Sequence, residues 1–136
     1  MSDSSNEKHE VMQHVPFESL TGKTLTNVIV SDDRTEINIH TAVGDCYRLW
    51  HEQDCCEEVR IEEIIGDLDD LIGHPLLLAE EVVFEGETGP IQRDEDSGTG
   101  TWTFYKLSTI KGSVTFRWLG TSNGYYSETV SFAKVT

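Results

Sequence analysis

The sequence predicts a mainly β fold of the α+β class: a strongly bent antiparallel sheet or partly open barrel of about seven strands with one short helix. Two observations favour this fold. Apolar and polar residues alternate in several short runs, as in strands with one buried face, and residues typical of tight turns separate these runs. Helical spacing of apolar residues is confined to one short segment.

Turn residues set the limits of the expected strands. Asp32-Asp33 and Gly44-Asp45 predict turns in the first half of the chain, and Ile110-Lys111-Gly112 predicts a hairpin turn near its end. The alternation within the strand after Gly44-Asp45 places Cys46, Arg48 and Trp50 on one face and Tyr47, Leu49 and His51 on the other. The expected strands cover residues 24–31, 34–41, 46–51, 59–65, 101–109, 113–119 and 125–135, and residues 76–84 are expected to form a further extended run.

The one expected helix covers residues 66–73. Asp67 is suited to cap its N-terminus, and Gly73 is suited to end it. Between them, Leu68, Leu71 and Ile72 share one helical face, so this helix is expected to cover one opening of the sheet.

The chain has the length of a single domain. Residues 1–16 are polar and lack periodicity, so they predict a disordered or loosely docked arm. Residues 17–136 form the expected β-rich domain. Within it, residues 85–100 are rich in Gly, Asp, Glu and Ser, which predicts a mobile surface loop.

Net charge limits the kind of partner. The chain has 25 acidic and 10 basic residues, a net charge of −15. Such a charge disfavours direct contact with nucleic acid or an anionic membrane and favours a basic partner. The charge is also uneven, because residues 52–70 contain nine acids and one base, Arg60.

Three cysteines, Cys46, Cys55 and Cys56, form no even disulfide framework. Adjacent cysteines bridge each other only through a strained ring, so the thiols are expected to be reduced. The N-terminus has no apolar signal-peptide region. These features predict a cytoplasmic protein, and no long apolar segment predicts a membrane span.

Residues 51–58, His-Glu-Gln-Asp-Cys-Cys-Glu-Glu, concentrate the groups that bind metals and exchange protons. His51, Cys55 and Cys56, with Asp54 and Glu57 nearby, are weak candidates for a metal site. Adjacent cysteines do not match the paired spacing of zinc ligands, so one buried and one sheet-edge thiol is the favoured interpretation. No metal or other cofactor is therefore predicted.

No catalytic residues are predicted either. The acids around Cys55 and Cys56 stabilise thiol over thiolate, which opposes nucleophilic catalysis. Asp67, Asp69 and Asp70 lack the spacing of a calcium loop and are better explained by capping and solvation. The sequence also lacks the glycine-rich phosphate motifs and the Gly-x-Ser-x-Gly motif of common enzyme classes.

Near the C-terminus, aromatic rings stand beside amide and hydroxyl groups, a mixture that suits recognition of a planar ligand or a protein surface. Hairpin turns and core packing explain the same residues about equally well. The residues expected to bind a ligand or partner are Trp50, His51, Asp54, Glu57, Tyr105, Arg117, Ser122, Asn123 and Tyr125.

Three motifs together resemble a domain-of-unknown-function family found in bacteriophages and bacteria. They are HEQDCCE at 51–57, GDLDDLIG at 66–73, and TFYKLSTIKGSVTFRWLGTSNGYYSE at 103–128, within a similarity covering roughly residues 20–134. The resemblance implies no activity. It does imply a setting inside the bacterial host cell, where small phage-type accessory proteins often bind and neutralise a host factor.

The leading hypothesis is a phage-type inhibitor or sequestering module that presents an acidic face to a basic host protein, in one version by mimicking nucleic acid. The alternative is a small-molecule or nucleotide-signal binder with an aromatic and polar pocket. A third hypothesis is a metal-dependent hydrolase. The oligomeric state is left open.

Overall fold

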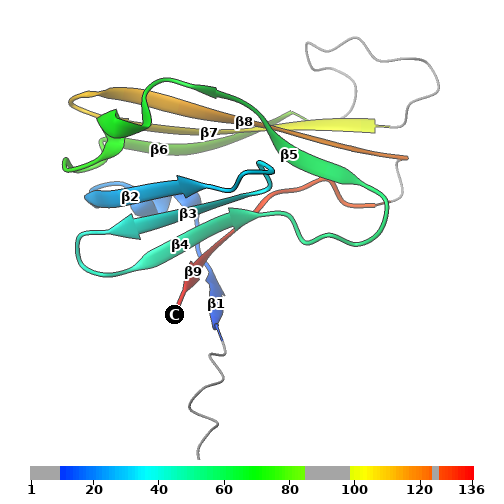
Figure 1. The fold of residues 1–136 in the computed structure, drawn as a ribbon, viewed down its shortest axis with the longest axis horizontal. Coiled ribbons are helices and arrows are strands. Elements are labelled where there is room, and N and C mark those ends of the chain that lie inside the picture. Colours follow the sequence, from blue (N-terminus) through cyan, green and yellow to red (C-terminus); the bar gives the residue numbers. More distant parts are fainter. Residues whose placement is uncertain (1–9, 85–98, 124–125) are drawn as a thin grey trace, which may run out of the picture.

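The computed structural model describes residues 10–84, 99–123 and 126–136, which form two antiparallel sheets facing each other as a sandwich (Figure 1). The strands are β1 (Met12–His14), β2 (Leu25–Val30), β3 (Glu36–Thr41), β4 (Cys46–Trp50), β5 (Glu58–Ile65), β6 (Leu78–Phe84), β7 (Thr99–Thr109), β8 (Gly112–Ser122) and β9 (Ser131–Val135). One sheet has the order β1-β9-β4-β3-β2, and the other has the order β5-β8-β7-β6. The mainly β class is therefore confirmed.

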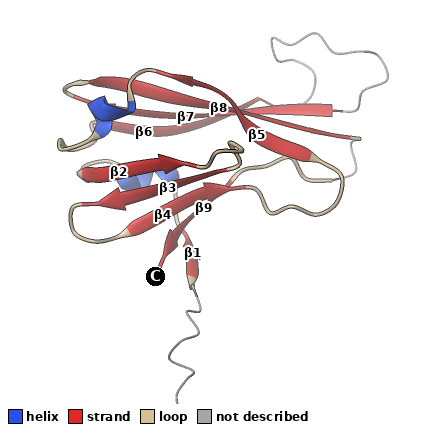
Figure 2. Cartoon of the chain, viewed as in Figure 1, coloured by secondary structure: helices blue, strands red, loops and turns tan. Residues whose placement is uncertain are grey.

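The predicted single bent sheet or partly open barrel is wrong. In the described part of the chain, nine strands form two separate sheets, instead of about seven strands in one. Local hairpin patterns do not reveal pairings between distant segments, and the structure has three of these: β4 with β9, β5 with β8, and β1 with β9. Residues 51–57 carry the chain from the first sheet to the second (Figure 2).

The hairpins β2–β3, β3–β4 and β7–β8 are confirmed. In β4, the buried Tyr47 and Leu49 alternate with the half-buried Cys46, Arg48 and Trp50, as the sequence pattern indicated. Trp50 and Tyr47 therefore lie on opposite faces of their sheet.

Strand β9 begins at Ser131, six residues later than expected.

The helix expected over residues 66–73 is only a 3-10 turn, η3 (Leu68–Leu71). The Asp67 side chain caps it as predicted, accepting a hydrogen bond from the Asp69 N–H at 3.0 Å. Gly73 follows with a φ of 89°, a conformation that ends the turn. The five residues between these two signals leave room for little more than one turn, and four of them form the tighter 3-10 turn.

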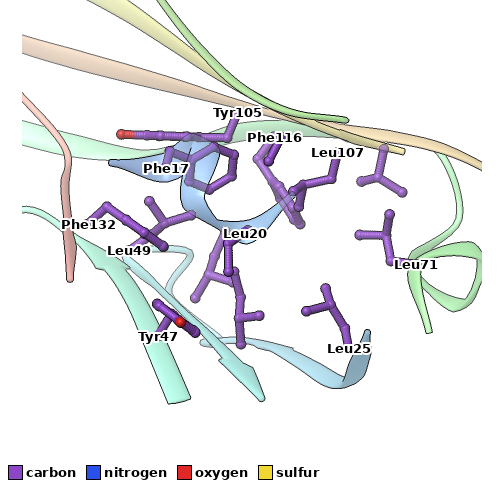
Figure 3. Close-up of a cluster of buried hydrophobic side chains, with 14 of the residues drawn as sticks. Phe17, Leu20, Leu25, Tyr47, Leu49, Leu71, Tyr105, Leu107, Phe116 and Phe132 are labelled. Carbon is purple, nitrogen blue, oxygen red and sulfur yellow. The ribbon is translucent and has the colours of Figure 1, made fainter. Parts of the chain in front are cut away.

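The core lies between the sheets (Figure 3). A second 3-10 turn, η2 (Phe17–Leu20), inserts two buried side chains into it. The Phe17 ring lies 4.7 Å from that of Tyr105 in one sheet and 5.0 Å from that of Phe132 in the other, measured between centroids. Phe17 thus joins the two layers, an arrangement that local sequence patterns did not predict.

Two segments with expected disorder fall partly outside the described residues. Within the arm expected over residues 1–16, Met12–His14 pair with β9, and the Val11 N–H donates to the Thr136 carbonyl at 3.0 Å. Residues 1–9 lie outside the described part. So do residues 85–98 of the loop expected over 85–100, whereas Thr99 and Gly100 begin β7.

No helix among the described residues has both the length and the apolar character that crossing a membrane requires.

Candidate functional site

A buried ion pair organises the connection between the two sheets. The Nε2 atom of His51 lies 2.6 Å from Oε2 of Glu57, and the two side chains are only 4% and 0% exposed. His51 follows the last residue of β4, and Glu57 precedes the first residue of β5. The pair therefore closes residues 51–57 into a loop at the point where the chain changes sheets.

The second ring nitrogen of His51 is engaged as well. Its Nδ1 atom lies 2.6 Å from the carbonyl oxygen of Thr129, in the segment before β9. A carbonyl oxygen and an ionised carboxylate can only accept hydrogen bonds, so both ring nitrogens must donate. Through these two contacts His51 ties the 51–57 loop to the segment before β9.

Glu57 accepts several hydrogen bonds from its own loop. The N–H groups of Asp54 and Cys55 donate to its two carboxylate oxygens at 2.7 and 2.9 Å. Burial by itself raises the pKa of Glu57, but the hydrogen bonds from His51 and from the N–H groups of Cys55, Asp54 and Glu57 outweigh it and lower the pKa to about 2. A carboxylate that accepts this many hydrogen bonds organises the loop and is a poor proton acceptor.

The backbone bends at Cys55 and Cys56, and the two cysteines form a disulfide with each other. Both are exposed, while Cys46 is free and half-buried. The expectation of reduced thiols, one buried and one at a sheet edge, is therefore wrong. It assumed an extended chain, in which neighbouring side chains point apart, whereas the loop curls around Glu57.

The weak metal candidates do not form a site in this arrangement. Both nitrogens of His51 are engaged, and the sulfur atoms of Cys55 and Cys56 are bonded to each other. Across residues 10–84, 99–123 and 126–136, no three His, Cys, Asp or Glu side chains are grouped closely enough to hold a metal ion.

A second buried carboxylate, that of Glu128, lies next to Thr129 in the chain. The hydroxyl of Thr101 in β7 donates to its Oε1 atom at 2.7 Å, and the hydroxyl of Ser122 at the end of β8 donates to its Oε2 atom at 2.5 Å. Glu128 thus fixes the segment before β9 to the four-stranded sheet, while Thr129 fixes the same segment to the 51–57 loop.

Gly120 makes this arrangement possible. A Cβ atom at position 120 would lie 2.6 Å from the carbonyl oxygen of Glu128 and 3.1 Å from a methyl group of Val59. Real Cβ atoms do not approach backbone oxygens so closely, so the segment carrying Glu128 can pack here only against glycine.

The surface of this end is acidic. Glu52 and Asp54 are exposed on the 51–57 loop, and the exposed Glu58 begins β5. The Trp50 indole N–H donates to the Glu52 carboxylate at 3.3 Å, and the Gln53 amide donates to the Glu57 carbonyl at 2.8 Å. We call this surface, formed by Glu52, Asp54 and Glu58, the acidic end of the sandwich.

The structure brings together some of the residues predicted to bind and separates others. His51, Asp54 and Glu57 share the acidic end, and Ser122 is connected to it through Glu128. Asn123 is exposed directly after β8. Tyr125 lies outside the described residues.

The other predicted binding residues lie on different surfaces. Trp50 is on the outer face of the five-stranded sheet, and Arg117 is on the outer face of the four-stranded sheet. Tyr105 is buried between the sheets, where its hydroxyl donates to Glu81 at 2.6 Å; burial, that hydrogen bond and nearby acids raise its pKa. One pocket cannot contain all three.

Two surface hollows lie near the β3–β4 turn. This turn is at the end of the sandwich opposite to the connection between β4 and β5 (Figure 1). One, of about 320 Å³, is lined by residues that include Lys23, Thr24 and Val43. The other, of about 440 Å³, is lined by residues that include Asn27 and His40. Neither contains a residue that the sequence predicted to bind.

Sequence reasoning missed Thr101 and Glu128. Glu128 is one of 25 acids in the chain, and its neighbours carry no pattern that distinguishes a buried carboxylate from an exposed one. The only available signal was Gly120, which interrupts the alternation of β8.

Comparisons with known proteins place the chain in a family. No curated protein and no solved structure shows significant similarity to it. A family model matches residues 18–132, nearly the whole chain, and the protein therefore belongs to the family described as Domain of unknown function (DUF7448).

Proposed function

We propose that this protein is a small acidic binding module whose acidic end engages a basic host protein, as an inhibitor or sequestering factor of the phage type. The observation that carries the proposal is the buried tie from Glu57 through His51 to Thr129. It holds a loop with exposed acids in one conformation, which lowers the entropy lost when a partner binds.

Charge supports the same proposal. At −15 the chain attracts basic surfaces over the range of the Debye length, and Glu52, Asp54 and Glu58 offer carboxylates at its end. Electrostatic attraction of this kind raises the rate of association with a basic partner and excludes acidic ones. Mimicry of nucleic acid by these carboxylates is the most specific form of the proposal.

Affinity capture from a bacterial lysate tests it. The wild-type chain, the double variant Glu52→Gln with Asp54→Asn, and the control Glu18→Gln with Asp69→Asn are immobilised in parallel. Glu18 in η2 and Asp69 in η3 are exposed acids outside the acidic end, and η3 follows the end of β5 opposite to Glu58. Both double variants therefore have the same net charge. Captured proteins are quantified at low and high salt.

The proposal predicts a basic protein that the wild type and the control retain at low salt and that the Glu52/Asp54 variant loses. High salt should release it from the wild type and from the control. If both double variants retain the protein equally, or if it stays bound at high salt, the acidic end is not its binding site.

A further inference from the structure

A cluster of aromatic side chains covers the outer face of the four-stranded sheet. Phe84 of β6 pairs with Trp102 of β7, and Phe104 lies two residues further along β7. The Phe104 ring centroid is 5.5 Å from that of Phe84 and 6.0 Å from that of Trp102. These rings point away from the core, because Tyr105 and Leu107, on the opposite face of β7, belong to it.

A cation completes the cluster. The Arg117 guanidinium lies 4.7 Å from the ring centroid of Trp102 and 5.8 Å from that of Phe104. Aromatic residues and arginine are the residues most enriched in the centres of protein interfaces. We call Phe84, Trp102, Phe104 and Arg117 together the aromatic face.

Much of the surrounding surface is apolar and uncovered. Phe84 is 46% exposed, and on the same face Ile65 of β5 and Leu78 of β6 are 48% and 42% exposed. Among the described strands and 3-10 turns, none lies over this face (Figure 2). Phe84 and the rings beside it form an exposed apolar patch on the β6 side of this sheet, and such a patch is typical of an interaction site.

Unlike the acidic end, this face is balanced in charge. Glu63 forms an ion pair with Arg117, Glu62 lies 3.9 Å from Arg60, and Glu80 stands directly opposite Lys106. In a chain of net charge −15, these pairs leave one broad surface without a large excess of negative charge. A strongly basic partner is therefore attracted to other surfaces.

We propose that the aromatic face binds a second copy of this chain. Two copies repel each other wherever their acidic surfaces approach. The aromatic face is a surface across which they can meet without bringing unpaired like charges together. A twofold dimer uses the same patch on both copies, so Phe84 and Phe104 of one copy would contact those of the other, while Trp102, only 4% exposed, supports them from below. The two acidic ends stay outside the contact and remain open to partners.

Sedimentation equilibrium of the full chain tests this inference, with Phe84→Glu as the disrupting variant. Ile29→Glu is the matched control, because Ile29 is 47% exposed on the outer face of the other sheet. Each variant adds one negative charge at an exposed position, and far-UV circular dichroism checks that each is folded.

The wild type and Ile29→Glu should form dimers whose dissociation constants agree. Phe84→Glu should weaken the dimer by roughly tenfold or more, as the loss of a central interface residue does. Added salt should leave the wild-type dimer intact, since apolar contacts hold it.

A wild type that stays monomeric up to high micromolar concentration would overturn the inference. So would a dimer that survives Phe84→Glu and is lost in Ile29→Glu. The proposal of a basic partner is separate, because capture by the acidic end fails or succeeds whether the chain is monomeric or dimeric.

Discussion

His51 and Glu57 are the two side chains on which the conformation of the 51–57 loop depends most. Their contact removes two charges from water, and such a contact is favourable only when every remaining hydrogen-bonding group is satisfied. The structure meets that condition through Thr129, Asp54 and Cys55. We therefore expect the pair to act as a unit.

The protonation state of His51 is the first consequence at this scale. Both of its ring nitrogens face acceptors at 2.6 Å, so nitrogen NMR shifts at neutral pH should show both nitrogens protonated. In the variant Glu57→Gln, one of these contacts loses its charge, and the imidazolium signal should weaken. A neutral tautomer in the wild type would contradict the geometry.

Glu57 also makes a defined contribution to the pH dependence of stability. Its pKa is about 2 in the folded chain and ordinarily 4.5, so the unfolded state binds the proton more tightly. The stabilisation is therefore fully present above about pH 4.5 and is lost as the pH falls through about 2.

Urea denaturation over this pH range measures the effect. The difference in free energy of unfolding between the wild type and Glu57→Gln should be constant above pH 4.5 and should shrink as the pH approaches 2. Glu80→Gln, which removes one exposed carboxylate, is the control for the change in net charge. A difference that is the same at both ends of the range would show that Glu57 is not held as an ion.

Thr101 tests the second buried carboxylate. Thr101→Val keeps the side-chain shape and removes the hydroxyl that donates to Glu128, leaving a buried acceptor with one partner fewer. We expect a loss of about 1–3 kcal/mol in the free energy of unfolding. Thr101→Ser keeps the hydroxyl and should lose less, and equal losses in the two variants would assign the effect to packing instead.

At the scale of elements, sequence patterns predicted what is local. The hairpins β2–β3, β3–β4 and β7–β8 followed from alternation and turn residues, because the two strands of a hairpin and its turn are adjacent in the sequence. The pairings of β4 and β1 with β9 join residues far apart in the chain, and no local pattern encodes them.

The candidate site shows the same division. The motif at 51–57 indicated that His51 and Glu57 belong to one ligand- or partner-binding site, but it did not indicate that the two side chains form a buried ion pair. The expected strand over 125–135 is shortened to Ser131–Val135, since Glu128 turns inward to Thr101 and Ser122. That inward turn depends on contacts with two other strands, which sequence periodicity cannot show.

Gly120 tests how β8 supports the segment before β9. Gly120→Ala places a Cβ 2.6 Å from the Glu128 carbonyl oxygen, a backbone atom that cannot move freely. We expect a destabilisation of about 1–3 kcal/mol, with altered NMR signals for Ser122 and Thr129. Gly112→Ala is the control, because its Cβ would meet only the end of the Asp70 side chain, which can rotate away. If the two variants lose the same free energy of unfolding, the close contact between position 120 and Glu128 does not explain the loss.

On the scale of the whole molecule, the sandwich separates two kinds of surface. The acidic end is formed by the connection between the sheets and is held by buried polar groups, whereas the outer face of the four-stranded sheet is aromatic and balanced in charge. Neither surface depends on the other. The two can therefore serve different contacts, one with a basic partner and one with a second copy.

The salt dependence of partner binding tests the central claim most directly. Once the basic protein captured by the wild type is identified, its dissociation constant is measured by calorimetry over a range of ionic strength. Binding through exposed carboxylates predicts an affinity that falls steadily as salt screens them, with a shallower slope in the Glu52/Asp54 double variant. An affinity independent of salt, or the same slope for the wild type and the variant, would contradict the account.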